Sequence, residues 1–228
     1  MLIEVLADAA AVATRAAEFI ADEARNAVTA RGRFLMAVSG GHTPWQMLRR
    51  LAELALPWDR VHVFQIDERV APDGDPDRNL THIRECLRGA PLPAGQLHPM
   101  PVENPDLQVA ADGYARELQE IAGTPPTLDL IHLGLGPDGH TASLVPGDPV
   151  LEVADRDVAL TNPYQNRRRM TLTYPVLDRA RRVLWVVTDT EKQSMVKRLL
   201  DGDRSIPAGR VRPDNALIIC DKAARGMQ

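Results

Sequence analysis

Two runs of five apolar residues, FLMAV at 34–38 and VLWVV at 183–187, limit the possible folds of this chain more than any other feature. A strand with one face in water alternates apolar and polar residues, whereas a strand covered on both faces is apolar throughout. Along the chain such segments alternate with segments of helical period. This alternation predicts an α/β fold with a mostly parallel sheet and helices on both sides.

The expected helices and strands follow one another without a repeat or an obvious linker, so we expect one domain over residues 1–228. A proline-rich connection covers 91–105. Helices are expected at about 9–29, 44–54, 79–87, 106–121 and 191–200, and strands at 2–7, 33–39, 61–67, 128–135, 157–162, 169–174, 183–189 and 215–220.

Composition excludes several function classes. The 228 residues are 44% hydrophobic, enough for a full core, and the formal net charge of −4 argues against nucleic acid as the main partner. Cys86 and Cys220 lie far apart in the sequence and are expected to be buried, reduced thiols. The start MLIEVLADAA has no basic stretch, and no window is long and apolar enough for a membrane span. We therefore expect a cytoplasmic protein with no membrane partner.

In parallel α/β sheets, ligands bind beyond the carboxyl ends of the strands. The first such loop is SGGHTP, 39–44. Thr43 is expected to cap the next helix, with Pro44 at its first position. The glycines before it leave amides open to an anion at the positive end of the helix dipole. The pattern favours a phosphate site, although an ordinary tight turn would have the same residues.

The second loop, QIDERV at 65–70, has three consecutive charges after an apolar strand. Charges are costly in a core, so we expect all three to face a cleft or solvent. There Arg69 can bind a phosphate or carboxylate, and Asp67 can bind a sugar hydroxyl or transfer a proton. The alternative is a solvated strand end with a local ion pair.

The third loop, LGLGPDGHTASLVPG at 133–147, has the spacing of a dinucleotide fingerprint, GxGxxG. Such a fingerprint should open the first strand–helix–strand unit, whereas this one lies past the middle of the chain. Asp138 would also repel a pyrophosphate. The glycines are instead expected to bend the chain so that His140 emerges near the mouth of the sheet, as a general base or acid beside Asp138 and Thr141.

The fourth loop is cationic. Arg167, Arg168 and Arg169 precede a strand, and Lys192 lies in the first turn of a helix, where a cation is unfavourable unless an anion is bound. The arginines are either ordinary surface charge or part of a phosphate clamp.

The remaining histidines indicate no metal site. His62 and His132 are expected in the core, and His82 and His98 on the surface. None has the paired spacing of metal ligands.

The motifs SGGHTP, DERVAP followed by RN, LGLGPDGHTASLVPG, RRMTLTYPVL and VTDTEK occur in this order over most of the chain. Together they resemble the glucosamine-6-phosphate isomerase/6-phosphogluconolactonase family, on its lactonase side. The resemblance implies a three-layer α/β/α sandwich, a modified Rossmann-like fold of the NagB type. It also implies hydrolysis of 6-phospho-D-glucono-1,5-lactone to 6-phosphogluconate in the oxidative pentose phosphate pathway, without metal or organic cofactor. We expect a monomer or a small homo-oligomer, and the sequence does not decide between them.

The resemblance also implies roles for individual residues. His140 would be the catalytic base, the SGGHTP loop would hold the phosphate with Lys192 and an arginine, and Asp67 and Arg69 would line the sugar. The expected set is catalytic His140 and Asp67, with Ser39, Gly40, Gly41, Thr43, Arg69, Asp138, Arg168, Arg169 and Lys192 binding the substrate.

Four positions depart from the family pattern. His42 and Arg78 stand where serine is frequent, Val145 replaces a common phenylalanine, and Asp189 replaces a common glycine. Asp189 weakens the expectation for Lys192, because a nearby carboxylate can pair with that ammonium.

Two other functions remain open on the same fold. A glucosamine-6-phosphate deaminase has a glutamate five residues after the histidine, where this chain has Val145. A sugar-phosphate sensor would need no His140 and would carry a DNA-binding module, for which we expect no room. The residues favour the lactonase.

Overall fold

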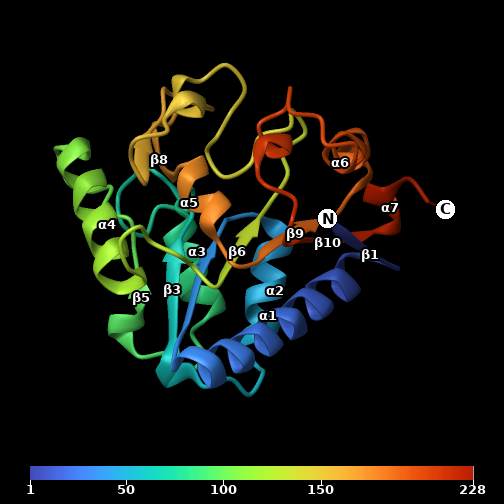
Figure 1. Cartoon of the computed structure of the whole chain (residues 1–228), viewed down its shortest axis with the longest axis horizontal. Helices are drawn as coiled ribbons and strands as arrows, with labels where there is room; N and C mark the ends of the chain where they lie inside the picture. Colours follow the sequence, from blue (N-terminus) through green and yellow to red (C-terminus); the bar gives the residue numbers. More distant parts are fainter. Residues whose placement is uncertain (228) are drawn as a thin grey trace.

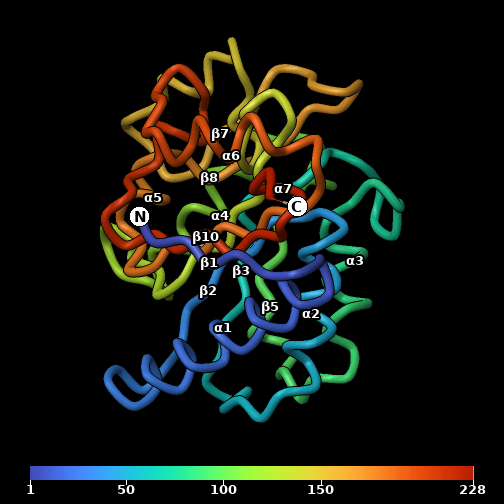
Figure 2. Tube along the Cα trace, turned by 90° about the vertical axis from the view of Figure 1, so that its right-hand side faces the viewer, coloured from blue at the N-terminus to red at the C-terminus, as the bar shows by residue number. Residues whose placement is uncertain are grey.

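The computed structural model describes residues 1–227. Its central sheet is parallel throughout and joins both ends of the chain, since β1 pairs with β10 (Figure 2). The sheet runs in the order β1 (Leu2–Leu6), β10 (Ala216–Asp221), β9 (Val183–Val187), β6 (Leu130–Leu133), β2 (Phe34–Val38), β3 (Val61–Gln65) and β5 (Leu97–His98). In Figure 1, the strands β10, β9, β6 and β3 follow one another across the molecule in the order of the sheet, with β2 between β6 and β3.

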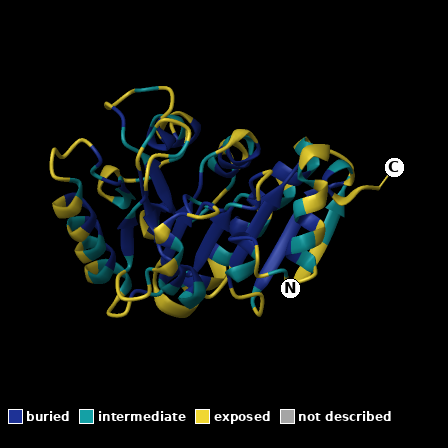
Figure 3. Ribbon diagram, turned by 90° about the horizontal axis from the view of Figure 1, so that it is seen from above, coloured by how far each residue is buried: buried dark blue, intermediate teal, exposed yellow. Residues whose placement is uncertain are grey.

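Helices cover both faces of this sheet. One face packs against α1 (Ala9–Arg31), α2 (His42–Ala52) and α3 (Asn79–Cys86). The opposite face packs against α4 (Leu107–Ala122), α5 (Tyr174–Arg179), α6 (Gln193–Leu200) and α7 (Lys222–Arg225). Figure 3 shows the strands as the buried layer and the outer faces of the helices as exposed. The predicted three-layer α/β/α architecture is confirmed.

The apolar strands are explained by this layering. In β2, Phe34, Met36 and Val38 pack under α1 and α2, whereas Leu35 and Ala37 pack into the core on the other face. Successive side chains of a strand point to opposite faces, so a strand covered on both sides has no face in water and is mostly apolar.

A second, antiparallel sheet departs from the expectation. Its order is β4 (Asp67–Arg69), β8 (Arg169–Leu172) and β7 (Val158–Leu160). The segments at 157–162 and 169–174 were expected as strands, but neither belongs to the parallel sheet. β4 follows β3 after Ile66 alone, and it turns the chain from one sheet into the other.

The other differences are local. β5, α5 and α7 were not expected, and the helix expected at 191–200 begins with a 3₁₀ turn at Thr190–Lys192. Cys86 and Cys220 are free and buried, as expected. Within residues 1–227, no helix is both long enough and apolar enough to cross a bilayer.

His98 is buried, although a surface position was expected. Its ring stacks on Phe64 at 4.3 Å, and its Nδ1 lies 2.7 Å from the Glu117 carboxylate. A partner 19 residues away gives this histidine a polar contact in the core, and no local sequence pattern shows that contact.

His132, in β6, is fully buried as expected, and burial lowers its pKa from 6.5 to about 3. The folded protein therefore keeps this ring neutral while the unfolded chain protonates it below about pH 6.5. The unfolding free energy therefore does not depend on this group above about pH 6.5, and it falls between pH 6.5 and 3 by up to about 1.4 kcal/mol per pH unit.

We expect His132→Gln to flatten the decline in unfolding free energy between pH 7 and 5, measured by urea unfolding. Equal slopes in both proteins would contradict this.

Candidate active site

A cavity of about 370 Å³ lies at the carboxyl ends of four adjacent strands, β9, β6, β2 and β3. This is the edge where a parallel α/β sheet binds its ligands. The expected site residues found in its wall are Ser39, Gly40, Gly41, Thr43, Asp67, Arg69, His140, Arg169 and Lys192.

The loop after β2 supplies an uncapped helix start. Gly41 is the N-cap of α2 and has no side chain to cap it, and the first amides of a helix have no intrahelical acceptor. The Ser39 hydroxyl is buried at the cavity and has no hydrogen-bond partner among residues 1–227. Open amides and an unpaired hydroxyl on one wall are suited to an anion.

Thr43 does not cap this helix, contrary to the expectation, because α2 begins at His42, two residues before the expected start at Pro44. The Thr43 hydroxyl instead lies 2.6 Å from the hydroxyl of Thr188, just after β9. This contact fixes the start of α2 against the end of a neighbouring strand.

The loop after β6 presents His140, whose side chain is 21% exposed. Its Nδ1 lies 2.6 Å from Asp138 Oδ1, and its backbone amide donates to the same oxygen. Gly136 makes this geometry possible, because a Cβ there would overlap the imidazole Nδ1 of His140. Gly139 has φ +83°, which favours glycine. The glycines of this motif therefore shape the His140 loop.

Asp138 fixes the protonation of the neutral ring. Burial opposes ionisation, but hydrogen bonds from His140 and Tyr164 outweigh it and hold the pKa of Asp138 below its usual range. The carboxylate only accepts hydrogen bonds, so Nδ1 carries the proton and Nε2 keeps its lone pair.

Asp67 is buried in the cavity wall and held from two sides. Ser143 donates its hydroxyl to Oδ2 at 2.6 Å, and Asn79 Nδ2 donates to the Asp67 carbonyl at 2.9 Å. Asn79 Oδ1 also accepts from Arg69. A Cβ on Gly40 would overlap that amide oxygen, so the SGGHTP loop at 39–44, the anion loop, packs directly on Asn79.

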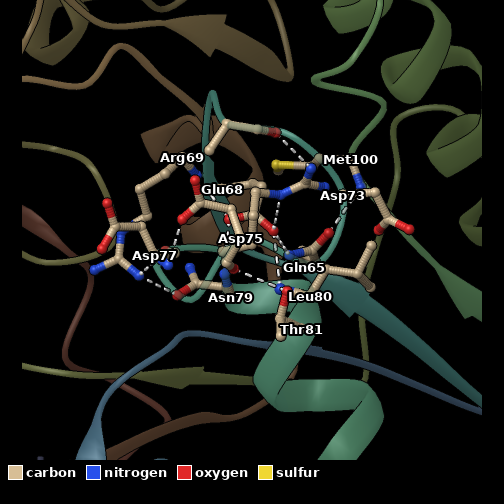
Figure 4. A network of polar contacts seen from close by, with 12 residues as sticks. Gln65, Glu68, Arg69, Asp73, Asp75, Asp77, Asn79, Leu80, Thr81 and Met100 are labelled. Carbon is tan, nitrogen blue, oxygen red and sulfur yellow. Dashed lines mark hydrogen bonds and ion pairs between the residues drawn. The ribbon is translucent and has the colours of Figure 1, made fainter.

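Glu68 faces away from the cavity and is fully buried, although exposure was expected. Its neighbours along β4 face the cavity, as the two-residue period of a strand requires. Arg78 Nε lies 3.0 Å from Glu68 Oε2, which is close enough for an ion pair, but the two atoms are not aligned as a hydrogen bond. The Glu68 carboxylate accepts from the amides of Arg69, Asn79 and Leu80 and from Gln65 Nε2 (Figure 4).

The three consecutive arginines at the start of β8 have different positions. Arg169 is buried in the cavity wall, and its Nε has no partner among the described residues. Arg167 pairs with Asp75 and Asp77. Arg168 is exposed and lies outside the cavity, in a groove beside Pro105–Gln108, so the structure does not bring it to the site.

Lys192 reaches the cavity and pairs with Glu191 at 2.9 Å. Asp189, which was expected to compete for this ammonium, lies in the wall with φ +82°, a backbone conformation that favours the glycine common in the family. Lys192 and the SGGHTP loop therefore line the same cavity.

Sequence reasoning missed Tyr164 and Gln165. Gln165 and Asn166 both have positive φ, 50° and 63°, in a two-residue turn closed by Tyr164 and Arg167. The turn puts Gln165 in the cavity wall, where it accepts from Arg169 Nη2 at 2.9 Å. The one local signal is Asn166, since asparagine tolerates the left-handed region.

No cluster of three or more histidine, cysteine, aspartate or glutamate side chains with metal-binding geometry occurs within residues 1–227. The cavity instead combines amides, two arginines and a lysine with a histidine–carboxylate pair. Such a combination on a parallel α/β sheet is typical of enzymes that bind a small anion and transfer a proton.

Comparison with known proteins agrees with this class. The model of the family "Glucosamine-6-phosphate isomerases/6-phosphogluconolactonase" matches residues 7–220, and the chain belongs to this family. A 6-phosphogluconolactonase of Synechocystis is 36% identical over 95% of this chain and 93% of its own length. One of Mycobacterium tuberculosis is 35% identical over 97% and 96%. The expectation of an enzyme of the lactone-hydrolase type is confirmed.

Solved structures show the same fold. A 6-phosphogluconolactonase of Thermotoga maritima superposes with a TM-score of 0.87 at 29% identity, over 96% of this chain and 98% of that one. A monomeric glucosamine-6-phosphate deaminase superposes with a TM-score of 0.86 at 16% identity, over 100% of both chains. The fold alone therefore does not distinguish a lactonase from a deaminase. The residues of the site have to distinguish them.

Proposed function

We propose that the protein, as one catalytic domain, hydrolyses 6-phospho-D-glucono-1,5-lactone to 6-phosphogluconate, with His140 as general base. The observation that carries the proposal is the Asp138–His140 pair beside a cavity that also holds the anion loop, Arg169 and Lys192. Lactonase relatives with 33–36% identity over nearly the whole chain support the substrate class.

The reaction needs one base and one oriented water. Neutral His140 takes a proton at Nε2 from the water that attacks C1, while Asp138 accepts from Nδ1 and stabilises the imidazolium. The tetrahedral intermediate then collapses, the bond from C1 to the ring oxygen breaks, and His140 returns the proton to that oxygen. Asp67, held by Ser143 and Asn79, is placed to bind a sugar hydroxyl.

The substrate phosphate is held by the amides at the start of α2 and by Arg169 and Lys192. Burial lowers the pKa of Arg169, but an arginine remains charged at neutral pH. A phosphate would offer its unpaired Nε an acceptor.

We expect Arg169→Ala to raise KM for the phosphorylated lactone by about tenfold or more, since a charged hydrogen bond contributes about 1.5–3 kcal/mol. Arg168→Ala is the matched control, because Arg168 is the next residue in the sequence but lies outside the cavity, and we expect KM to stay within about twofold. Steady-state kinetics on phosphorylated and unphosphorylated gluconolactone separate the roles. An equal loss on both substrates would show that Arg169 does not bind the phosphate.

The alternative activity is deamination of glucosamine 6-phosphate. Proton transfer between carbons needs more acid–base groups than ester hydrolysis, and the position of the deaminase glutamate holds Val145, which is buried. Incubation with glucosamine 6-phosphate should release no ammonia above background. Ammonia release comparable to lactone turnover would favour the deaminase.

A further inference from the structure

Tyr164 contacts both the Asp138–His140 pair and Arg169. It does not itself line the cavity in the described part of the chain. Its hydroxyl donates to Asp138 Oδ2 at 3.1 Å, while the other oxygen of that carboxylate faces His140 at 2.6 Å. Its ring meets the His140 ring edge-on at 5.5 Å between centroids. On the other side, the Arg169 guanidinium lies over the Tyr164 ring at 4.9 Å.

Asp138 needs such support because its side chain is 37% exposed. A carboxylate open to water exchanges its hydrogen bonds with solvent and can rotate away from a histidine. The tyrosine hydroxyl gives the second oxygen a fixed donor, and a doubly anchored carboxylate keeps its first oxygen on Nδ1. Without this anchor, the neutral ring is free to carry its proton on either nitrogen.

Tyr164 is itself held in place. Its backbone pairs with Arg167 in both directions, across the turn formed by Gln165 and Asn166. Burial and the neighbouring Asp138 raise the pKa of the Tyr164 hydroxyl, so it remains a protonated donor at neutral pH. The residue is therefore a rigid and permanent hydrogen-bond donor to Asp138.

We propose that Tyr164 is a positioning residue for the reaction: through Asp138 it holds His140 in the tautomer with the proton on Nδ1 and the lone pair on Nε2. The inference rests on the proposed function of His140 as general base. Tyr164 acts through Asp138 and does not contact the substrate. Its ring separately supports Arg169, so the two functions of the side chain can be removed one at a time.

The kinetic test separates these functions. Tyr164→Phe keeps the ring under Arg169 and removes only the hydroxyl. We expect kcat on 6-phosphogluconolactone to fall about tenfold, with KM within about twofold. Tyr164→Ala also removes the ring, and we expect KM to rise in addition. Tyr174→Phe is the matched control, since its hydroxyl bonds to the Pro207 carbonyl, and it should keep wild-type kcat.

Two further readouts show whether Tyr164 works through Asp138. In an Asp138→Asn background, Tyr164→Phe should lower kcat by less than about twofold more, because the partner is already lost. Nitrogen-15 NMR of labelled histidine should show one His140 tautomer in the wild type, protonated on Nδ1, and a mixture in Tyr164→Phe. A merely structural role would leave this tautomer signal unchanged.

The outcomes are distinguishable. If His140→Asn keeps near wild-type turnover, the proposed function fails, and this inference fails with it. If His140→Asn is inactive but Tyr164→Phe matches Tyr174→Phe in kcat and leaves the tautomer signal unchanged, the inference alone is wrong. A further tenfold loss in the Asp138→Asn background would also overturn it, since Tyr164 would then act on another group.

Discussion

Replacing His140 by asparagine should lower kcat for 6-phosphogluconolactone hydrolysis by at least about 100-fold, the scale of a positioned general base. Asparagine occupies similar space and can still donate to Asp138, but it cannot take a proton from water. The side chain is partly exposed, so its loss should leave the folded state intact. Initial rates with fresh lactone, corrected for spontaneous hydrolysis, give the measurement.

The control for this variant is His82→Asn. His82 stacks on Trp45 and lies outside the cavity, so we expect kcat within about twofold of wild type. Thermal unfolding should show similar midpoints for wild type and His140→Asn. Near wild-type turnover by a folded His140→Asn protein would remove His140 from the mechanism.

Replacing Glu68 by alanine should have the largest effect on stability, about 3–5 kcal/mol. Neither Glu68 nor Arg78 has exposed side-chain surface. Among residues 1–227, the change leaves the buried guanidinium with Glu103 as its one carboxylate partner, and Glu103 is itself 44% exposed. The change also removes the acceptor of the Asn79 and Leu80 amides at the start of α3. Urea unfolding monitored by circular dichroism measures the loss.

Glu103→Gln is the matched control, because it removes the other carboxylate from the same arginine. Glu103 is partly in water, so we expect a cost of about 1 kcal/mol or less. Equal losses in the two variants would contradict the account of Glu68 as the principal buried partner of Arg78.

The layers of the fold were predictable because they depend on local sequence. An apolar run such as 183–187 is typical of a strand covered on both faces, and here its residues divide between the two cores. The antiparallel sheet was not predictable. Its strand β4 has three charged residues, and the sequence does not show that Arg169–Leu172 pairs with it about 100 positions further on.

The site residues could be predicted where they lie on a loop that follows a strand of the sheet. His140, Asp67 and the SGGHTP loop lie at the cavity because they follow β6, β3 and β2, three strands of the parallel sheet, at their carboxyl ends. The local sequence did not predict the position of a side chain whose interaction partner lies far away in the sequence. Glu68 is buried because Arg78 accompanies it, and Tyr164 reaches Asp138 across 26 residues.

The central claim is that this cavity hydrolyses a phosphorylated sugar lactone. The most direct test is the rate at which the wild-type protein consumes freshly made 6-phospho-D-glucono-1,5-lactone, corrected for spontaneous hydrolysis and compared with unphosphorylated gluconolactone. We expect saturable turnover well above the spontaneous rate, with a much higher kcat/KM for the phosphorylated lactone. A rate equal to the spontaneous one, from protein shown to be folded, would contradict the account.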